Sequence, residues 1–168
     1  MAAVEVRRIG AGEGTLLKEV RLAALRDAPH AFASDVEEES AWPPDAWADR
    51  AGQRSEGYDA ANFVAESEEG AVGLVGAYRS QEEPGTVELV SMWVAPAARG
   101  QGIGAQLVER VVDWAREGAA RRVALWVMRG NEPALALYER TGFVRTAHGM
   151  PADHPCSEET RMVRELPP

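Results

Sequence analysis

The sequence predicts one α/β domain with a mixed sheet, and three observations support that fold class. The length of 168 residues is that of a single domain. Hydrophobic residues make up 45% of the chain and charged residues 27%, as is typical of globular proteins. Along the chain the spacing of apolar residues changes from helical to alternating, and later switches between the two. We therefore expect residues 1–168 to fold as one unit.

The first half of the chain is expected to supply two helices and an antiparallel meander. Apolar residues at helical spacing predict a helix over residues 15–26, which Pro29 ends. Residues 37–53 predict an acidic loop and a second helix, because Pro43 and Pro44 suit a helix start. Alternating apolar residues and hairpin-length turns predict strands over residues 4–9, 62–66, 71–79 and 86–94.

The second half is expected to alternate strands and helices. Residues 104–117 have one apolar face and end at Gly118, which predicts an amphipathic helix. An apolar run predicts a buried strand over residues 122–128, and Asn131 is a suitable N-cap for a helix over residues 131–141. Closing strands are expected over residues 143–146 and 159–166. Because a meander precedes strand–helix–strand units, the sheet should be mixed.

Composition excludes several classes of protein. The net charge of −9 argues against a general nucleic-acid binder, which needs a basic face. A single lysine, Lys18, excludes a phosphate loop of the Gly-Lys-Ser/Thr type. No apolar run approaches the roughly 18 residues of a membrane span. The single cysteine, Cys156, cannot form an internal disulfide, so a cytoplasmic location is expected, and the scattered histidines predict no metal site.

A glycine-rich loop between a strand and a helix predicts a pyrophosphate site. Gly100, Gly102 and Gly104 allow the backbone to approach a ligand closely, and the N–H groups of the following helix start favour an anion. Arg99 adds planar donors suited to phosphate. A Rossmann loop of the G-x-G-x-x-A type is one interpretation. In a Rossmann domain an acidic residue that binds the ribose follows about 20 positions after the loop, and the stretch between Gly118 and Asn131 has no Asp or Glu.

Two motifs in this region resemble those of the GCN5-related N-acetyltransferase (GNAT) superfamily. Residues 99–104, Arg-Gly-Gln-Gly-Ile-Gly, match R/Q-x-x-G-x-G/A, and residues 131–143 match N-x-x-A-x-x-L-Y-x-x-x-G-F. The resemblance covers residues 86–146 and implies a mostly antiparallel sheet, splayed between two central parallel strands and flanked by about four helices. It also implies that residues 1–85 cover the acceptor side, that residues 86–146 bind acetyl-CoA, and that residues 147–168 add a closing strand.

The activity implied by this resemblance is transfer of an acetyl group from acetyl-CoA to a primary amine, by direct attack in a ternary complex. The implied cofactor-binding residues are Met92, Trp93, Val94, Arg99, Gly100, Gln101, Gly102, Ile103, Gly104 and Asn131. Tyr138 is the implied general acid for the departing thiolate, although its helical face would also suit core packing.

Glu88 is the candidate base, because it lies eleven positions before Arg99, as the catalytic glutamate does in the histone-acetylating branch of the superfamily. By strand alternation Glu88 should share a face with Val90, Met92 and Val94, among apolar neighbours that would raise its pKa. A relay through water is the alternative route for the proton.

The acceptor is less well determined than the cofactor. Carboxylates expected near its entrance favour a small cationic amine or a basic peptide; they are Asp35, Glu37, Glu38, Glu39 and Asp45. The alternative functions are a module that binds acetyl-CoA or a nucleotide without transfer and, with less support, a NAD-dependent Rossmann-type protein. A homodimer is possible, and neither nucleic acid nor membrane is expected as a partner.

Overall fold

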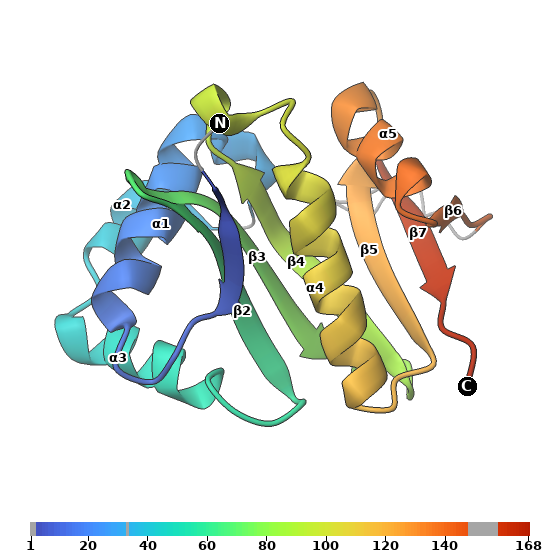
Figure 1. Cartoon of the computed structure of the whole chain (residues 1–168), viewed down its shortest axis with the longest axis horizontal. Helices are drawn as coiled ribbons and strands as arrows, with labels where there is room; N and C mark the ends of the chain where they lie inside the picture. The colour runs from blue at the N-terminus through green and yellow to red at the C-terminus, as the bar shows by residue number, and fades with distance from the viewer. Residues whose placement is uncertain (1–2, 33, 148–157) are drawn as a thin grey trace.

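A seven-stranded sheet runs through the molecule and carries helices on both faces (Figure 1). The structure, a computed structural model, describes residues 3–32, 34–147 and 158–168. The strands are β1 (Glu5–Arg8), β2 (Ala60–Ser67), β3 (Gly70–Arg79), β4 (Thr86–Val94), β5 (Arg122–Met128), β6 (Val144–Arg145) and β7 (Glu159–Glu165). The helices are α1 (Gly14–Asp27), α2 (Val36–Ser40), α3 (Pro44–Gln53), α4 (Ile103–Glu117) and α5 (Glu132–Arg140), with short 3₁₀ turns at Pro29–Ala31 and Pro96–Ala98.

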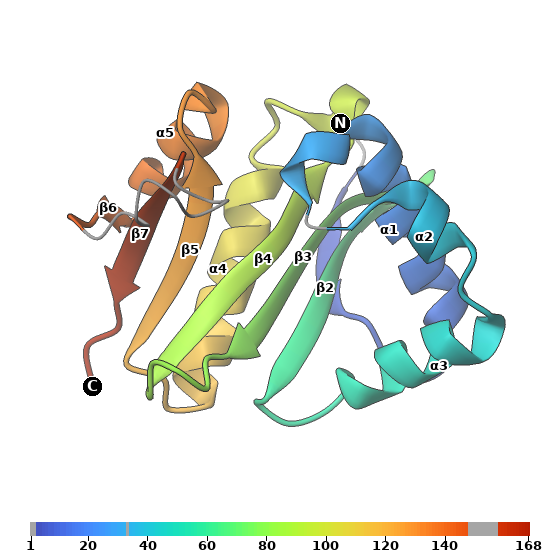
Figure 2. The same ribbon diagram turned by 180° about the vertical axis from the view of Figure 1, so that it is seen from behind.

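The sheet order is β1-β2-β3-β4-β5-β7-β6, and its paired strands are antiparallel except for β4 and β5. That parallel pair joins Thr86, Val87 and Glu88 to Arg122, Val123 and Ala124. Past Glu88 no further β4–β5 pairing is found among the described residues, and the two strands separate (Figure 2). The predicted splayed, mixed sheet is therefore confirmed.

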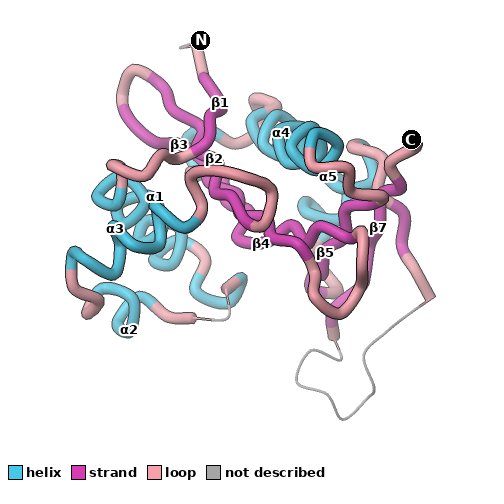
Figure 3. The backbone as a smooth tube through the Cα atoms, turned by 90° about the horizontal axis from the view of Figure 1, so that it is seen from below, coloured by secondary structure: helices cyan, strands magenta, loops and turns pink. Residues whose placement is uncertain are grey.

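The helices lie in two layers, with α1, α2 and α3 on one face of the sheet and α4 and α5 on the other (Figure 3). The core between the sheet and α4 includes Phe63, Val87 and Leu107, all fully buried. A second core beneath α1 and α3 includes Leu17, Trp47 and Leu74. Successive side chains of a strand point to opposite faces of the sheet. Strand residues that alternate with those of one core therefore face the helices of the other layer.

A bulge in β4 reverses this alternation. Ser91 has φ +56°, and the pairing with β3 shifts between Leu74 and Gly76. Before the bulge, Val87 and Leu89 face α4; beyond it, Met92 and Val94 pack on the α4 side and Trp93 packs in the α1 core. The expectation that Glu88, Met92 and Val94 share one face is wrong, because the extra residue of a bulge changes the parity of the strand.

The sequence located most elements correctly, and the clearest difference lies in residues 37–53. This segment holds two helices rather than an acidic loop and one helix. The carboxylate of Asp35 caps α2 by accepting a 2.8 Å hydrogen bond from the Glu38 N–H, and Pro44 begins α3. Cys156, His148 and His154 lie outside the described residues.

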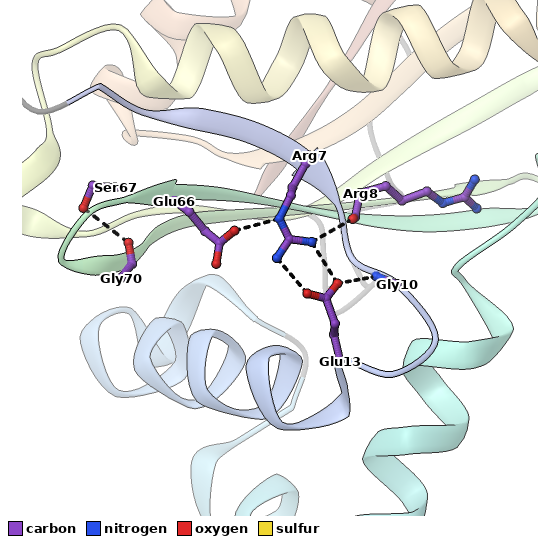
Figure 4. A network of polar contacts seen from close by, with 7 residues as sticks. All are labelled: Arg7, Arg8, Gly10, Glu13, Glu66, Ser67 and Gly70. Carbon is purple, nitrogen blue, oxygen red and sulfur yellow. Dashed lines mark hydrogen bonds and ion pairs between the residues drawn. The ribbon is translucent and has the colours of Figure 1, made fainter.

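Edge strand β1 is fixed to its neighbours by an arginine (Figure 4). The Arg7 guanidinium donates to Glu66 of β2 at 2.7 Å, and to both carboxylate oxygens of Glu13 at 2.7 and 2.8 Å. Glu13 also accepts a 2.6 Å bond from the Gly10 N–H. The hydrogen bond from Arg7 and that from Gly10 lower the pKa of Glu13 to about 2. The network thus ties together β1, β2 and the start of α1.

Candidate active site

The glycine loop presents a run of free backbone donors at the open end of the splay. Gly100 and Gly102 have φ values of +76° and +80°, in the left-handed region that favours glycine. Gly102 is the N-cap of α4 and provides no side-chain cap. Within the described chain, none of the six N–H groups from Gly100 to Ala105 donates a hydrogen bond. Such a run of N–H groups at a helix start suits a polyanion.

The Arg99 side chain lies at the surface and reaches toward the end of α1. Its guanidinium bonds the carboxylate of Asp27, at the end of α1, and donates to the Val94 carbonyl at 3.0 Å. The Trp93 indole N–H also donates to Asp27, at 2.9 Å. The hydrogen bond from Trp93, and then that from Arg99, lower the pKa of Asp27. Arg99 and Trp93 therefore anchor the end of β4 and the following loop to α1.

The second motif lies beside the same loop. The Asn131 side chain caps α5 by accepting a bond from the Ala134 N–H at 3.3 Å. A Cβ at Gly104 would lie 3.0 Å from the Leu137 side chain, so the start of α4 and the middle of α5 are in close contact. The fold thus brings residues 99–104, the end of β4 and α5 together around the splay.

Tyr138 lies in the core on the α4 side of the sheet. The residue is 6% exposed, and its ring packs edge-on against Phe143 with 5.8 Å between centroids. Burial raises the pKa of the Tyr138 phenol well above its usual value. A phenol in this environment keeps its proton over the whole physiological range, and the role of Tyr138 as general acid stays a prediction.

Glu88 lies on the opposite face of the sheet and is paired. Both of its carboxylate oxygens accept 2.7 Å hydrogen bonds from Arg161 of β7, and both side chains are buried. The same guanidinium donates to Glu83 at 3.0 Å and lies 5.0 Å from the centre of the Trp126 ring. The expectation of apolar surroundings is wrong, since Arg161 occupies both oxygens; the role of base stays a prediction.

A cavity of about 890 Å³ opens on the α1 face of the sheet, beside Glu88. Aromatic side chains from β3, β5 and the loop after α1 line it: Tyr78, Trp126 and Phe32. Its charged lining consists of Arg21, Arg79, Glu82, Glu83, Glu88, Glu159 and Arg161. Tyr138 and this cavity lie on opposite sides of the sheet, so the splay is the place where groups from the two faces can meet.

The five carboxylates expected at the acceptor entrance do not line this cavity. Glu39 is instead 1% exposed and pairs with Arg21 of α1 at 2.8 and 2.9 Å. The remaining nitrogen of the Arg21 guanidinium, Nη1, donates to the Ser91 hydroxyl at 2.8 Å. The Arg21–Glu39 pair is therefore linked to the bulge in β4. For Glu39 the expected placement at an entrance is wrong, because it is buried against Arg21; for the other four carboxylates it stays a prediction.

Arg21 and Arg161 are site residues that sequence reasoning missed. Arg21 stands between Val20 and Leu22 in an otherwise apolar stretch of α1, which is a signal for a buried partner. Arg161 had no comparable signal, because its partner Glu88 is 73 positions away. In the part of the chain that the structure describes, no cluster of His, Cys, Asp and Glu could hold a metal ion, and no helix has the length and apolar character needed to cross a membrane.

Comparison with known proteins agrees with this geometry. A sequence model of the acetyltransferase (GNAT) family matches residues 22–143. The chain belongs to the GNAT acetyltransferase family. Streptothricin acetyltransferase of Streptomyces lavendulae is 34% identical over 123 residues, which are 71% of this chain and 62% of that protein. The N-alpha-acetyltransferase RimI of Mycobacterium tuberculosis is 40% identical over 75 residues, 44% of this chain and 46% of that one. In these GNAT relatives the match spans less than two thirds of their length.

Solved GNAT structures share the fold. An acetyltransferase of the GNAT family from Streptococcus pneumoniae superposes with a TM-score of 0.76 at 16% identity, over 98% of this chain and 100% of that one. The PaiA N-acetyltransferase of Thermoplasma acidophilum, solved in complex with coenzyme A, gives 0.68 at 15% identity, over 98% and 99% of the two chains. The Rossmann interpretation is wrong, because the loop follows the fourth strand of a mostly antiparallel sheet.

Proposed function

We propose that this chain transfers the acetyl group of acetyl-CoA to a primary amine by direct attack in a ternary complex. The observation that carries the proposal is the run of free N–H groups from Gly100 to Ala105, at the open end of the splay. These groups would bind the pyrophosphate. The edge of β4 at residues 92–94, which lacks a β5 partner, would pair with the pantetheine arm, and Asn131 would contact the arm from the α5 side.

In the proposed reaction the amine nitrogen forms a bond to the acetyl carbon, and the bond from that carbon to sulfur breaks. Tyr138 gives its proton to the departing sulfur, a step worth about 10²–10⁴-fold in rate. The amine has a reference pKa of ~10.4, so it must lose a proton before it attacks. Glu88 and a relay of water are the two routes that we consider for that proton.

The lining of the cavity on the α1 face supports a cationic acceptor. Its two buried arginines are each held by a buried glutamate, so neither is free to bind a substrate carboxylate. Glu82 and Glu159 line the same cavity as the three aromatic side chains. Carboxylates beside aromatic faces suit a small amine or a peptide that carries a second positive charge.

The test is amine-dependent release of the CoA thiol across a panel of amines. We expect polyamines and basic peptides to react, and acidic amino acids to react poorly. Glu159→Gln with Glu82→Gln should raise the KM for cationic amines, whereas Glu37→Gln with Glu38→Gln, away from the cavity, should not. Turnover of acidic amines alone would reject the acceptor class.

The variant Tyr138→Phe tests the chemistry. It should lower kcat by about 10²–10⁴-fold and leave CoA binding intact, because only the proton donor is lost. Tyr58→Phe is the matched control, since Tyr58 packs against Trp114, with 6.1 Å between ring centres, at the end of α4 away from the loop. A Tyr138→Phe enzyme with normal kcat would refute the general-acid role.

A module that binds acetyl-CoA without transfer is the second candidate, because both oxygens of the predicted base are already bonded to Arg161. Tight binding of acetyl-CoA with no amine-dependent thiol would favour it. A cytoplasmic location and a homodimer stay predictions.

A further inference from the structure

The Glu88–Arg161 ion pair crosses the sheet over an intervening strand. Glu88 belongs to β4 and Arg161 to β7, and β5 lies between them. The backbone of Arg161 pairs with Trp126 of β5, and its guanidinium lies over the Trp126 ring before it reaches the carboxylate. The pair therefore joins β4 to the β5–β7 half of the sheet through side chains.

This connection stands at the place where the two halves separate. Glu88 and Ala124 form the last backbone pair between β4 and β5, and the strands beyond it have only their outer neighbours within the described chain. The Arg161 and Glu88 side chains are only 5% and 10% exposed, and the two 2.7 Å bonds form the parallel, two-pronged arrangement that fixes orientation as well as distance.

We propose that the Glu88–Arg161 pair is a positioning element that fixes the gap between β4 and β5, and that Glu88 acts through this pair and does not serve as the base. The inference rests on the proposed function, because the width of the gap matters only when a thioester lies in it. Neither residue is a catalytic residue in this view. Both set where the reacting groups of the two faces meet.

The position of the pair explains why its loss should affect the rate. Residues 89–94 of β4 and 125–128 of β5 have no ladder between them that would hold their separation. Among the described residues, the short parallel pair and this ion pair connect β4 to the β5–β7 half within the sheet, and on the other face α4 packs against both strands. Since misplacement of reacting atoms by about 1 Å can cost roughly 100-fold in rate, a gap that varies should lower kcat more than it weakens CoA binding.

Three variants separate positioning from base catalysis: Glu88→Gln, Arg161→Met, and Glu88→Met combined with Arg161→Met. The double variant replaces the pair by apolar side chains and guards against failure to fold. Arg7→Met is the matched control, because it removes a paired arginine at the opposite edge of the sheet. For each variant we measure kcat, KM for acetyl-CoA, and the pH profile of kcat/KM.

If the Glu88–Arg161 pair is a positioning element, all three variants should lose roughly 10- to 100-fold in kcat. The KM for acetyl-CoA should change by less than about threefold. The double variant should lose no more than the worse single variant, since one interaction is broken in each. The acidic limb of the pH profile should persist in Glu88→Gln. Loss of that limb, with near-normal kcat in Arg161→Met, would show that Glu88 is the base and overturn the proposal.

Amide hydrogen exchange supplies a measurement that needs no activity. Peptides covering residues 89–94 and 125–128 should exchange faster in Glu88→Gln and in Arg161→Met, relative to peptides of β2. Leu17→Ala, a cavity variant in the α1 core, should accelerate both regions alike. Unchanged relative exchange in the pair variants would overturn the positioning role. If the unmodified protein released no thiol with any amine, the proposed function would fail while the exchange data still decided this inference.

Discussion

The buried pair Arg21–Glu39 offers a strong test of how this fold is held together. Arg21 reaches from α1 to Glu39 of α2 with two hydrogen bonds and to Ser91 of β4 with a third. The side chains are 8% and 1% exposed. Removal of either partner leaves the other charge buried without compensation, which costs about 3–5 kcal/mol of unfolding free energy. That is a large part of the roughly 5–15 kcal/mol available to a domain.

We therefore expect Arg21→Met to lower the melting temperature by roughly 6–20 °C, at about 2–4 °C per kcal/mol for a protein of this size. Glu39→Gln should cost somewhat less, because an amide still accepts from Arg21. Arg21→Met combined with Glu39→Met should recover most of the loss, since an apolar replacement removes both buried charges. Thermal unfolding followed by tryptophan fluorescence measures the melting temperature of all three variants.

The pH dependence has a defined sign. Burial by itself raises the pKa of Glu39, but the hydrogen bonds and charge of Arg21 outweigh it, and the net pKa lies below the ordinary value of 4.5. The pair therefore stabilises fully above pH 4.5, and its contribution disappears as pH falls through the lowered pKa. This acid-dependent loss should be smaller in Glu39→Gln. A cost below about 1 kcal/mol for Arg21→Met, the range of exposed pairs, would refute the reasoning.

Three further results are expected. Gly102→Ala should cost about 1–2 kcal/mol, because a Cβ is unfavourable at φ +80°, and it should weaken CoA binding by calorimetry while leaving the secondary structure seen by circular dichroism unchanged. Glu13→Gln should remove a stabilisation of at most about 1 kcal/mol, because Glu13 is partly exposed. Since the pKa of Glu13 is about 2, this stabilisation is complete above pH 4.5 and disappears toward pH 2. Urea titrations of the unmodified protein at several pH values measure this loss. Gly104→Ala should displace Leu137 and lower stability measurably, and a neutral result would contradict the close packing of α4 against α5.

The elements and the glycine loop could be predicted from the sequence because their signals are local. Helical spacing located α1 and α4, and the Asn131 cap located α5; alternation located the meander, and an apolar run located β5. The run of free N–H groups that starts at Gly100 could be predicted because a strand, a glycine-rich loop and a helix follow one another in the sequence. The family motifs lie in this same local region, so they led to the correct family.

The polar contacts on the α1 face of the sheet could not be predicted, because they join residues that are distant in the sequence. Glu88 and Arg161 are 73 positions apart, and Arg21 and Ser91 are 70 apart. The bulge at Ser91 has no glycine or proline to indicate it, yet it decides which way Met92 and Trp93 point. Local alternation therefore placed Glu88 among the wrong neighbours.

Arginine side chains stabilise the three irregular segments of this backbone. A bulge, a splay and a left-handed loop each interrupt the regular ladder of backbone hydrogen bonds, and at each of them an arginine side chain adds contacts to a neighbouring element. Arg21 holds the bulge, Arg161 spans the splay to Glu88, and Arg99 anchors the loop. Each uses a forked guanidinium that can bond partners on two elements at once, which the single ammonium of lysine does less well. The free donors and the gap that a thioester would need can therefore persist without collapsing into ordinary sheet pairing.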